Sequence, residues 1–486
     1  MATSSPASGY TSYRDPENAA VGVDGRWYRV AGPSSAAALR RLRDSEVYTR
    51  RVADGSLVRF DEVHEDEATA ARDAYRDQTG RTMAEGSAVF SVETIAPITY
   101  PWEWPNSLLE AAAVLTLDLR ADLLGLGLDL KDASAFNVQF RGMRPVFLDL
   151  GSVEEWRPNP SWNASRQFIE HFVNPLAVGS GDRVTAADAW ELGRHRGLRS
   201  EAARQLLPKK ARRSFSLMLL QATTRPVEKN APSESKYAQS AQANPDLARN
   251  ATLSLTRRLR KQVVKLGGRR HATTWVDYGT RAHYGSDDLT RKSELATAFI
   301  TAAEGRNRLV LDVGGNDGFT ATHLVRHAGA QAIVMDADAG ALDVLLAGAS
   351  AVPDLVGRIT PLLGDITSLT PSSGLLGQEF ADFASRIRPS AVTCQAVLHH
   401  VVITQGTPMQ FAVDALASFG APVQIEFATE EDEKSRLLMS QIPNWAGDYS
   451  TESLLAALRR RYRSVEVRGT TSPTRVVVDA WDLQEQ

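Results

Sequence analysis

The sequence predicts an α/β protein whose C-terminal half folds as a largely parallel sheet with helices on both faces. One observation is the apolar run Arg308–Val313, which passes into the glycine-rich turn Gly314–Gly318 and then into a helical pattern, Phe319–His327. A second is a series of further apolar runs that end in acidic residues or histidines. Continuous apolar runs are typical of central parallel strands, and the strand–turn–helix order is how doubly wound sheets are built.

Seven strands are predicted, and most carry a polar residue at or near the end. Five apolar runs predict parallel strands: Arg308–Val313, Ala330–Met335, Ile359–Leu363, Ala391–Leu398 and Pro422–Phe427. Two further runs predict antiparallel strands that close the sheet: Ser464–Gly469 and Arg475–Trp481. Ligands of such sheets lie beyond the carboxyl ends of the strands. We therefore expect the following side chains to gather there: Asp312, Asp336, Asp365, His399 and Glu426.

The glycine-rich turn predicts a nucleotide-like cofactor. Gly314, Gly315 and Gly318 permit positive φ and bring backbone N–H groups against a ligand at the start of a helix. Asp312, Gly314, Asn316 and Gly318 follow one another at intervals of two residues, whereas the dinucleotide pattern has glycines at its first, third and sixth positions. The alternative is a tight packing turn that binds nothing.

Acidic residues after the second and third strands fit the same ligand. Asp336 and Asp338 follow the second strand, where a carboxylate can accept from both hydroxyls of a ribose. Asp365 follows the third strand and could hold an adenine amino group, or it could cap a helix.

Candidate catalytic residues follow the fourth strand and end the fifth. A histidine with a pKa near 6.5 suits the removal of a proton from a hydroxyl, so His399 or His400 is a candidate base and the other is structural. Glu426 could orient that base or bind an acceptor, or it could be a satisfied buried carboxylate. Trp275, Tyr278 and Tyr284 precede the first strand and could cover a sulfonium or an adenine, or form plain core.

Together these residues resemble a known family. Trp275–Tyr278, Tyr284, Lys292, Leu311–Gly318, Val397–His400 and Gln424–Phe427 are similar to the methyltransferase domain of NoeA-type nodulation proteins, over most of residues 272–486. The resemblance implies a Rossmann-like, seven-stranded class I methyltransferase domain. It also implies that S-adenosylmethionine is contacted by Gly314, Gly315, Asn316, Gly318, Asp336 and Asp365, with His399 and His400 facing the transfer centre.

The upstream half carries a second pattern. Lys131, Asp132 and Asn137 precede an apolar strand that ends in Asp149–Gly151, an order that resembles the catalytic loop and Asp-Phe-Gly segment of protein kinases and sugar or antibiotic phosphotransferases. In that chemistry Asn137 and Asp149 would hold magnesium on ATP. The sequence departs from the pattern, because residues 1–90 show no convincing glycine-rich loop and no phosphate-binding lysine on a strand.

Three interpretations of this half remain open. It could be an active phosphotransferase, or a kinase-like scaffold reused to bind substrate or to pack on the methyltransferase half. It could also be a chance resemblance, in which Asp132 and Asp149 are turn carboxylates. NoeA-type proteins resemble this half too, in Tyr100–Pro105, the Lys131–Asn137 element and Phe147–Ser152. That part of the resemblance implies a common architecture rather than a known activity.

Composition excludes several classes of function. The 486 residues carry a net charge of −3, which favours neither nucleic acid nor a membrane surface as a partner. One cysteine, Cys394, permits no intramolecular disulfide and fits a cytoplasmic protein. No Cys/His spacing predicts a metal site, no apolar run is long enough to span a bilayer, and residues 1–24 do not read as a signal peptide.

Shifts in composition predict four regions: a flexible tail, 1–25; an α+β accessory domain with kinase-like features that presents the substrate, 26–205; a helical connector, 206–271, with a mobile linker at 221–250; and the methyltransferase domain, 272–486. In the accessory domain, helices are expected at Ser35–Arg43, Asn106–Leu126 and Ser161–Leu176. The basic stretch from Arg257 to Arg270 is either a solvated helix face or a phosphate-binding surface.

The sequence therefore predicts an adenosylmethionine-dependent methyltransferase. We expect O-methylation of a small, glycosylated or natural-product acceptor of secondary metabolism, with the oligomeric state left open. One alternative is a Mg-ATP-dependent phosphotransferase or nucleotide-binding protein with a regulatory methyltransferase half. Another is a catalytically inactive interaction protein.

Overall fold

The computed structural model describes residues 15, 18–158, 162–181, 184–207, 209–212, 244–268, 285–303 and 308–484. The chain divides into two compact units. Unit 1 comprises Met1–Phe140, Arg144–Arg270 and Ser373–Phe380, and unit 2 comprises Arg141–Met143, His271–Ser372 and Ala381–Gln486. None of the described helices is long and apolar enough to cross a membrane.

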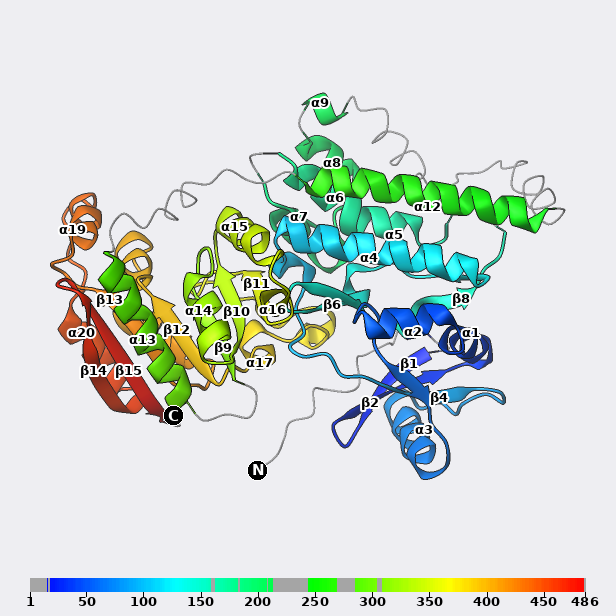
Figure 1. Ribbon diagram of the computed structural model, residues 1–486, viewed down its shortest axis with the longest axis horizontal. Coiled ribbons are helices and arrows are strands. Elements are labelled where there is room, and N and C mark those ends of the chain that lie inside the picture. Colours follow the sequence, from blue (N-terminus) through cyan, green and yellow to red (C-terminus); the bar gives the residue numbers. More distant parts are fainter. Residues whose placement is uncertain are drawn as a thin grey trace. The chain divides into compact units, whose positions relative to one another are not determined.

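Unit 2 is built on a seven-stranded sheet with the order β11-β10-β9-β12-β13-β15-β14 (Figure 1). Its strands are β9 (Leu309–Val313), β10 (Gln331–Asp336), β11 (Ile359–Leu363), β12 (Ala391–Gln395), β13 (Val423–Ala428), β14 (Tyr462–Ser472) and β15 (Arg475–Leu483). The first five pair in parallel, and β15 is antiparallel to both of its neighbours, β13 and β14. This is the methyltransferase-like α/β arrangement that the sequence predicted.

Helices connect these strands. They are α13 (Ser286–Ala302), α14 (Phe319–His327), α15 (Ala339–Ala349), α16 (Pro353–Val356), α17 (Phe383–Arg386), α18 (Met409–Ala417), α19 (Glu433–Ser440) and α20 (Thr451–Arg459). The chain runs from β9 out to β11 and then returns to β12 on the other side of β9. The switch in strand order thus falls between β9 and β12, which is where doubly wound sheets bind ligands.

The predicted strands differ from the observed ones mainly at β12 and β14. The run Ala391–Leu398 was expected to be one strand, but β12 ends at Gln395 and a π-helical turn follows at His400–Thr404. Ala396 takes a positive φ of 58°, which ends the strand although Val397 and Leu398 are apolar. β14 is longer than expected, since it pairs with β15 through two register shifts.

A row of polar side chains crosses the middle of this sheet. Thr393 on β12 lies opposite Asp312 on β9 and donates to its Oδ1 at 2.7 Å. Gln424 on β13 is the next residue in register, and its amide donates to Asp479 Oδ1 on β15 at 2.8 Å. All four side chains are buried. Hydrogen bonding across the row satisfies polar groups that would otherwise be costly to bury.

Unit 1 begins with an antiparallel sheet of order β1-β2-β4-β3 (Figure 1). Its strands are β1 (Asn18–Val23), β2 (Arg26–Ala31), β3 (Phe60–Glu62) and β4 (Ala88–Val92). The helix α3 (Glu65–Thr79) covers one face through Ala68, Ala71 and Tyr75. The prediction of a flexible tail at 1–25 is wrong for residues 18–23, because this segment pairs with β2 along its whole length.

The rest of unit 1 is mainly helical. Its helices are α1 (Pro33–Arg43), α2 (Glu46–Ala53), α4 (Asn106–Gly125), α5 (Ser165–Phe168), α6 (Asn174–Gly179), α7 (Ala186–Gly193), α8 (Ser200–Leu206), α9 (Lys209–Arg212) and α12 (Pro245–Gly267). A π-helical segment, Ile169–Val173, joins α5 to α6. Two short two-stranded sheets complete the secondary structure: β5 (Leu128–Leu130) with β8 (Val153–Glu155), and β6 (Val138–Arg141) with β7 (Arg144–Phe147).

The helix α12 lies along α4 (Figure 1). It contains the described part of the basic stretch, where Arg260 pairs with Asp118 of α4 through bonds of 2.6 and 3.0 Å. The predicted mobile linker is wrong for residues 245–250, which form the first turns of α12 behind the Asn244 cap. Residues 221–243, Arg269 and Arg270 lie outside the described part of the chain.

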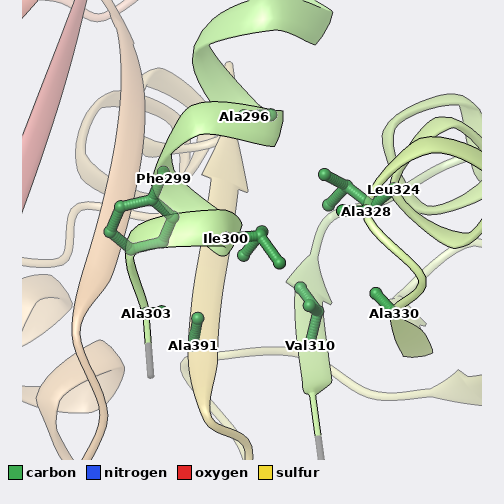
Figure 2. Close-up of a cluster of buried hydrophobic side chains, with 9 residues drawn as sticks. All are labelled: Ala296, Phe299, Ile300, Ala303, Val310, Leu324, Ala328, Ala330 and Ala391. Carbon is green, nitrogen blue, oxygen red and sulfur yellow. The ribbon is translucent and has the colours of Figure 1, made fainter. Parts of the chain in front are cut away.

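Buried apolar side chains join α13 to the sheet of unit 2 (Figure 2). Ala296, Phe299 and Ile300 of α13 pack with Val310 of β9 and Ala391 of β12. Phe299 is 1% exposed, and its ring centroid lies 4.7 Å from that of Trp481. Deleting a buried aromatic ring removes both its transfer free energy and its packing contacts.

We expect Phe299→Ala to lower the free energy of unfolding of unit 2 by about 3–5 kcal/mol, because the ring leaves a cavity beneath α13. Urea denaturation followed by tryptophan fluorescence measures the change. Phe411→Ala is the matched control, since Phe411 is 63% exposed and its removal should alter stability by no more than about 0.5 kcal/mol. Equal losses in the two variants would contradict the assignment of this core.

Candidate functional site

The glycine-rich turn follows β9 directly and is held against β10. Gly314 and Gly315 donate their N–H groups to Met335 O at 2.8 and 3.3 Å. A side chain at either position would collide with its surroundings: a Cβ on Gly314 would lie 2.3 Å from Val397 Cγ2, and one on Gly315 would lie 2.7 Å from Val334 Cγ1 and 2.8 Å from Asp312 Oδ2. Gly314, Asn316 and Gly318 have φ of 65°, 51° and 72°. The predicted positive φ occurs at Gly314 and Gly318 but not at Gly315. The expectation that the N–H groups of Gly314 and Gly315 face a ligand is wrong, because both donate to Met335 O.

Asp312 is buried at the end of β9 and is only half satisfied. Its Oδ1 accepts from Thr393, whereas its Oδ2 has no hydrogen-bond partner among the described residues. Burial raises the pKa of Asp312 to about 6, and the charge of Asp336 adds to this, against the opposing effects of Thr393 and the Lys292 ammonium. An unpartnered buried carboxylate oxygen is costly to a fold, so it is a candidate ligand contact.

The two acidic residues after β10 have different roles. Asp336 accepts from the backbone N–H groups of Asn316 and Asp338, at 2.8 Å each, and so fixes the turn to the second strand. Because a carboxylate offers about four acceptor positions, these bonds leave room for a ribose. Asp338 caps α15 through Oδ1, while its Oδ2 is buried and has no described partner.

Asp365 lies just beyond β11 and is held by neighbouring side chains. Its Oδ1 accepts from the backbone and hydroxyl of Thr367, at 2.8 Å each, and its Oδ2 accepts from Gln405 Nε2 at 2.9 Å. The alternative of helix capping does not apply, because no helix begins here and the carboxylate stabilises a local turn instead. Gln405 follows the π-helical turn after β12, so this bond joins the loops beyond β11 and β12.

His399 and His400 lie beyond β12 with their ring centroids 4.1 Å apart. His399 is 2% exposed, and neither of its ring nitrogens has a hydrogen-bond partner among the described residues. Burial lowers the pKa of His399 to about 3 and that of His400 to about 4. A pKa near 6.5, which suits a general base, was expected from the sequence, whereas both imidazoles here are neutral and weakly basic.

Glu426 on β13 is fully buried and has two charged or polar partners. Its Oε2 lies 2.8 Å from Lys292 Nζ of α13, and its Oε1 accepts from the Thr471 hydroxyl. Burial raises the pKa of Glu426, but the Lys292 charge and these hydrogen bonds outweigh it, so the pKa is lowered. Of the two alternatives from the sequence, the satisfied buried carboxylate agrees with these contacts.

Unit 1 brings together the residues that the sequence singled out there. Asn137 Nδ2 lies 3.2 Å from Asp132 Oδ1 and 2.9 Å from Ser152 Oγ, and Ser152 in turn donates to Asp149. Burial, reinforced by the Asp149 charge, raises the pKa of Asp132. Lys131 is turned to Asp15 instead, at 3.0 Å.

One member of this cluster was not predicted from the sequence. Arg29 on β2 places Nη2 2.7 Å from Asp149 Oδ1, and both side chains are largely buried. Gly151 makes room for the guanidinium, since a Cβ there would lie 3.0 Å from Arg29 Nη1. Among the described residues, no group of three or more His, Cys, Asp and Glu side chains could hold a metal ion. Trp275, Tyr278 and Tyr284 lie outside the described part of the chain.

Comparison with known proteins confirms the resemblance drawn from the sequence. The chain is 27% identical to Nodulation protein NoeA of Rhizobium meliloti (strain 1021) over 458 residues, which cover 93% of this chain and 92% of that protein. No family model matches the chain.

Solved structures resemble it weakly. An O-methyltransferase family protein from Burkholderia thailandensis matches at 15% identity and a TM-score of 0.29, over 41% of this chain and 58% of that one. Magnesium protoporphyrin IX methyltransferase from Synechocystis PCC 6803, with bound SAH, matches at 15% and 0.31, over 44% and 95%. The bifunctional kinase-methyltransferase WbdD matches at 20% and 0.29, over 42% and 41%. At these scores the likenesses carry no argument, and the fold assignment rests on strand order.

The raised pKa of Asp312 gives a test of its burial. The folded protein holds the proton more tightly than the unfolded chain, so the protonated carboxyl contributes stability below about pH 4 that is lost as the pH rises through about 6. Asp312→Asn cannot ionise, so we expect its stability relative to the wild type to rise by about 2 kcal/mol from pH 4 to pH 7. Urea denaturation across this range measures the difference.

Asp448→Asn is the control for that experiment, because it makes the same substitution at an exposed position. A flat profile for Asp312→Asn would mean that Asp312 is solvated rather than buried.

Proposed function

We propose that the chain is an S-adenosylmethionine-dependent methyltransferase that transfers methyl to oxygen of a small-molecule or glycosylated acceptor. One observation carries the proposal. Buried polar atoms without described partners gather at the carboxyl edge of the sheet, on Asp312, Asp338 and His399, beside the glycine turn. Buried polar groups are normally satisfied, so a set of exceptions at the edge where such sheets bind ligands is best explained by a ligand.

The residues at this edge fit adenosylmethionine. Gly314 and Gly315 let the turn pack closely against β10 and Val397, and Asp312 Oδ2 lies against the turn with capacity to accept. Asp336 keeps acceptor positions for ribose hydroxyls, and Asp365 offers its carboxylate beyond β11 to an adenine amino group. When bound, the cofactor supplies an electrophilic methyl group on its sulfonium.

The protein's own contribution is alignment. Methyl transfer is an in-line displacement, so positioning the acceptor oxygen against the methyl group can supply most of the acceleration. Val397 packs on Gly314, which fixes the segment that leads to His399 relative to the turn. The neutral His399 ring can donate or accept one hydrogen bond to an acceptor from a site that excludes water.

We expect Gly315→Ala to weaken binding of S-adenosylhomocysteine by about tenfold or more, because its Cβ would displace Asp312 and the turn. Isothermal titration calorimetry measures the affinity. Gly348→Ala is the matched control: it lies in α15 with no atom within 4 Å of its Cβ, so affinity should be unchanged. If the wild-type protein gives no heat with either S-adenosylhomocysteine or adenosylmethionine, the proposed function is wrong.

A second candidate function belongs to unit 1, and Arg29 favours it. A cation on a strand beside Asp149, near Asp132 and Asn137, supplies the phosphate-binding charge whose absence counted against a phosphotransferase. Arg29 and Asp149 are 120 residues apart in sequence. The resulting second candidate is a nucleotide-binding, kinase-like unit, and its rival is a scaffold with the same contacts and no ligand. The scaffold has in its favour that both Asp149 oxygens are already occupied, by Arg29 and Ser152, and that no group of carboxylates among the described residues could hold magnesium.

Calorimetry with Mg-ATP separates these two. If unit 1 binds nucleotide, Arg29→Ala should weaken binding about tenfold or more, because the phosphates lose a buried guanidinium. Arg26→Ala is the matched control on the same strand, since its side chain is 75% exposed and pairs only loosely with Glu67 at 3.5 Å. If the wild-type protein gives no heat with Mg-ATP, unit 1 is a scaffold that binds no nucleotide. Absence of heat with adenosylmethionine as well would favour a catalytically inactive interaction protein.

A further inference from the structure

The helix α12 turns a basic face away from α4. Its buried residues, Thr256 and Val263 among them, recur on one side, and Thr256 accepts a hydrogen bond from Arg120 of α4 at 2.9 Å. The opposite side carries four exposed cations within three helical turns. They are Arg257, Arg258, Lys261 and Lys265, and we call them the basic face.

No acidic side chain balances the basic face. Residues 247–268 contain no Asp or Glu. In the described part of the chain, the neighbouring Arg260 is paired with Asp118, whereas none of the four cations of the face has an ion pair. Arg257 and Lys261 are four residues apart, and so are Lys261 and Lys265, a spacing at which like charges destabilise a helix. The face therefore carries a repulsion that an external anion would relieve.

Exposed arginines elsewhere in unit 1 are arranged differently. Arg76 pairs with Asp73 on α3 at 2.8 Å. Arg249, which lies on α12 before the basic face, pairs with Asp246 at 2.7 Å. A solvated helix face normally mixes both signs of charge in this way. Of the two alternatives drawn from the sequence for the basic stretch, the contrast favours the phosphate-binding surface.

A second group of exposed cations adjoins the C-terminal end of the basic face. Leu266 of α12 packs on a buried cluster that includes Ala203 of α8 and Leu207, which follows that helix. Residues 194–212 carry seven Lys and Arg side chains and one acid, Glu201. The exposed cations on α8 and α9 are Arg204, Lys209 and Arg212. The net charge of −3 is thus an average over the chain that hides a strongly basic part of unit 1.

Aliphatic side chains are exposed on the same helix. Leu247 is 65% exposed, Leu255 is 58% exposed and Val264 is 42% exposed, whereas residues 244–268 contain no aromatic side chain. Surfaces that bind nucleic acid usually add aromatic rings on which bases stack. Surfaces that bind anionic lipid combine cations with apolar side chains that enter among the headgroups. The composition of α12 therefore favours lipid.

We propose that the basic face of α12 docks this protein on a bilayer surface that contains anionic phospholipid. The lipid phosphates take the place of the missing acidic side chains, and Leu255 enters among the headgroups beside the cations. The net charge argued against a membrane partner, but a docking face acts through its local field, which decays over about 8–10 Å at physiological salt. None of these residues lies at the carboxyl edge of the unit 2 sheet, so the inference goes beyond the proposed methyltransferase function and does not depend on it.

Co-sedimentation of the full-length protein with vesicles tests the docking. Phosphatidylcholine vesicles with about 30% phosphatidylglycerol should bind the protein in 50 mM sodium chloride, whereas vesicles of phosphatidylcholine alone should not. Binding should fall by about tenfold or more in 500 mM sodium chloride, because salt screens the attraction. Equal binding to both kinds of vesicle, or binding to neither, would overturn the proposal.

Substitutions assign the docking to α12. A Lys or Arg near an anionic surface strengthens partition by about fivefold, so R257Q, R258Q, K261Q and K265Q together should weaken it by about a hundredfold or more. R257K with R258K keeps the charge and should bind within about twofold of the wild type. The four side chains are exposed and unpaired among the described residues, and circular dichroism verifies that each variant is folded.

A matched control removes four exposed cations from unit 2 instead. It combines R326Q, R388Q, R436Q and R463Q, which change the net charge by the same amount and should keep binding within about threefold. An equal loss in this control would mean that net charge alone drives binding. Unchanged binding in the α12 variant would place the docking face elsewhere. Either result sinks the inference.

A fluorescent probe reports whether α12 itself meets the bilayer. The chain has one cysteine, Cys394, and it is buried, so acrylodan can be attached at Leu255→Cys. Its emission should shift to the blue with the anionic vesicles, because the probe leaves water. Phe411→Cys, on α18, is the control and should show no shift. A bound protein without a shift at Leu255→Cys would contradict the proposal.

Single-stranded RNA of about 20 nucleotides separates lipid from nucleic acid. Fluorescence anisotropy of labelled RNA should show weaker binding than the anionic vesicles show at equal phosphate concentration. Tighter binding to RNA, lost in the fourfold glutamine variant of α12, would make the basic face a nucleic-acid surface and the lipid proposal wrong.

Discussion

The buried ion pair between Lys292 and Glu426 is the interaction on which the candidate site depends. It joins α13 to β13 in the interior of unit 2, and the Lys292 charge also acts on Asp312 at the end of β9. A buried pair contributes little net stability, but loss of one partner leaves an uncompensated charge that costs about 3–5 kcal/mol. Glu426 thereby holds the strand end to which Ala396 is hydrogen-bonded. The end of β9 and the segment after β12 are thus both linked to this ion pair.

The local pattern of apolar residues was enough to predict the parallel strands of unit 2. Strands β9, β10 and β11 are mainly apolar, and burial on both faces produces such runs wherever a strand is central, whereas β13 alternates apolar residues with Gln424 and Glu426. β12 is shorter than its apolar run because Val397 leaves the strand to pack on Gly314, 83 residues before it in the chain. That is a tertiary contact, which no pattern within the run encodes. The seven-stranded order followed from the motifs and from the resemblance rather than from propensity.

The partners of the buried charged side chains could not be predicted from the sequence. Glu426 was identified as polar and important, but its partner Lys292 lies 134 residues away, so a free carboxylate and a satisfied one read alike. Arg29 was not predicted for a similar reason, because its partner Asp149 lies 120 residues away and the kinase pattern has a lysine, not an arginine, on the corresponding strand. The pKa values of His399 and His400 depend on burial, which a residue's identity does not reveal.

The polar row through the middle of the sheet has a consequence for how the sheet assembles. A slip of one residue between neighbouring strands turns every side chain to the opposite face. Thr393 would then lose Asp312, and Gln424 would lose Asp479, leaving four polar groups buried among apolar ones. Apolar strands alone would tolerate neighbouring registers more easily, since one valine or isoleucine packs much like another. The hydrogen bonds of this row therefore favour the native register, because a sheet with shifted strands would bury the same polar groups without partners.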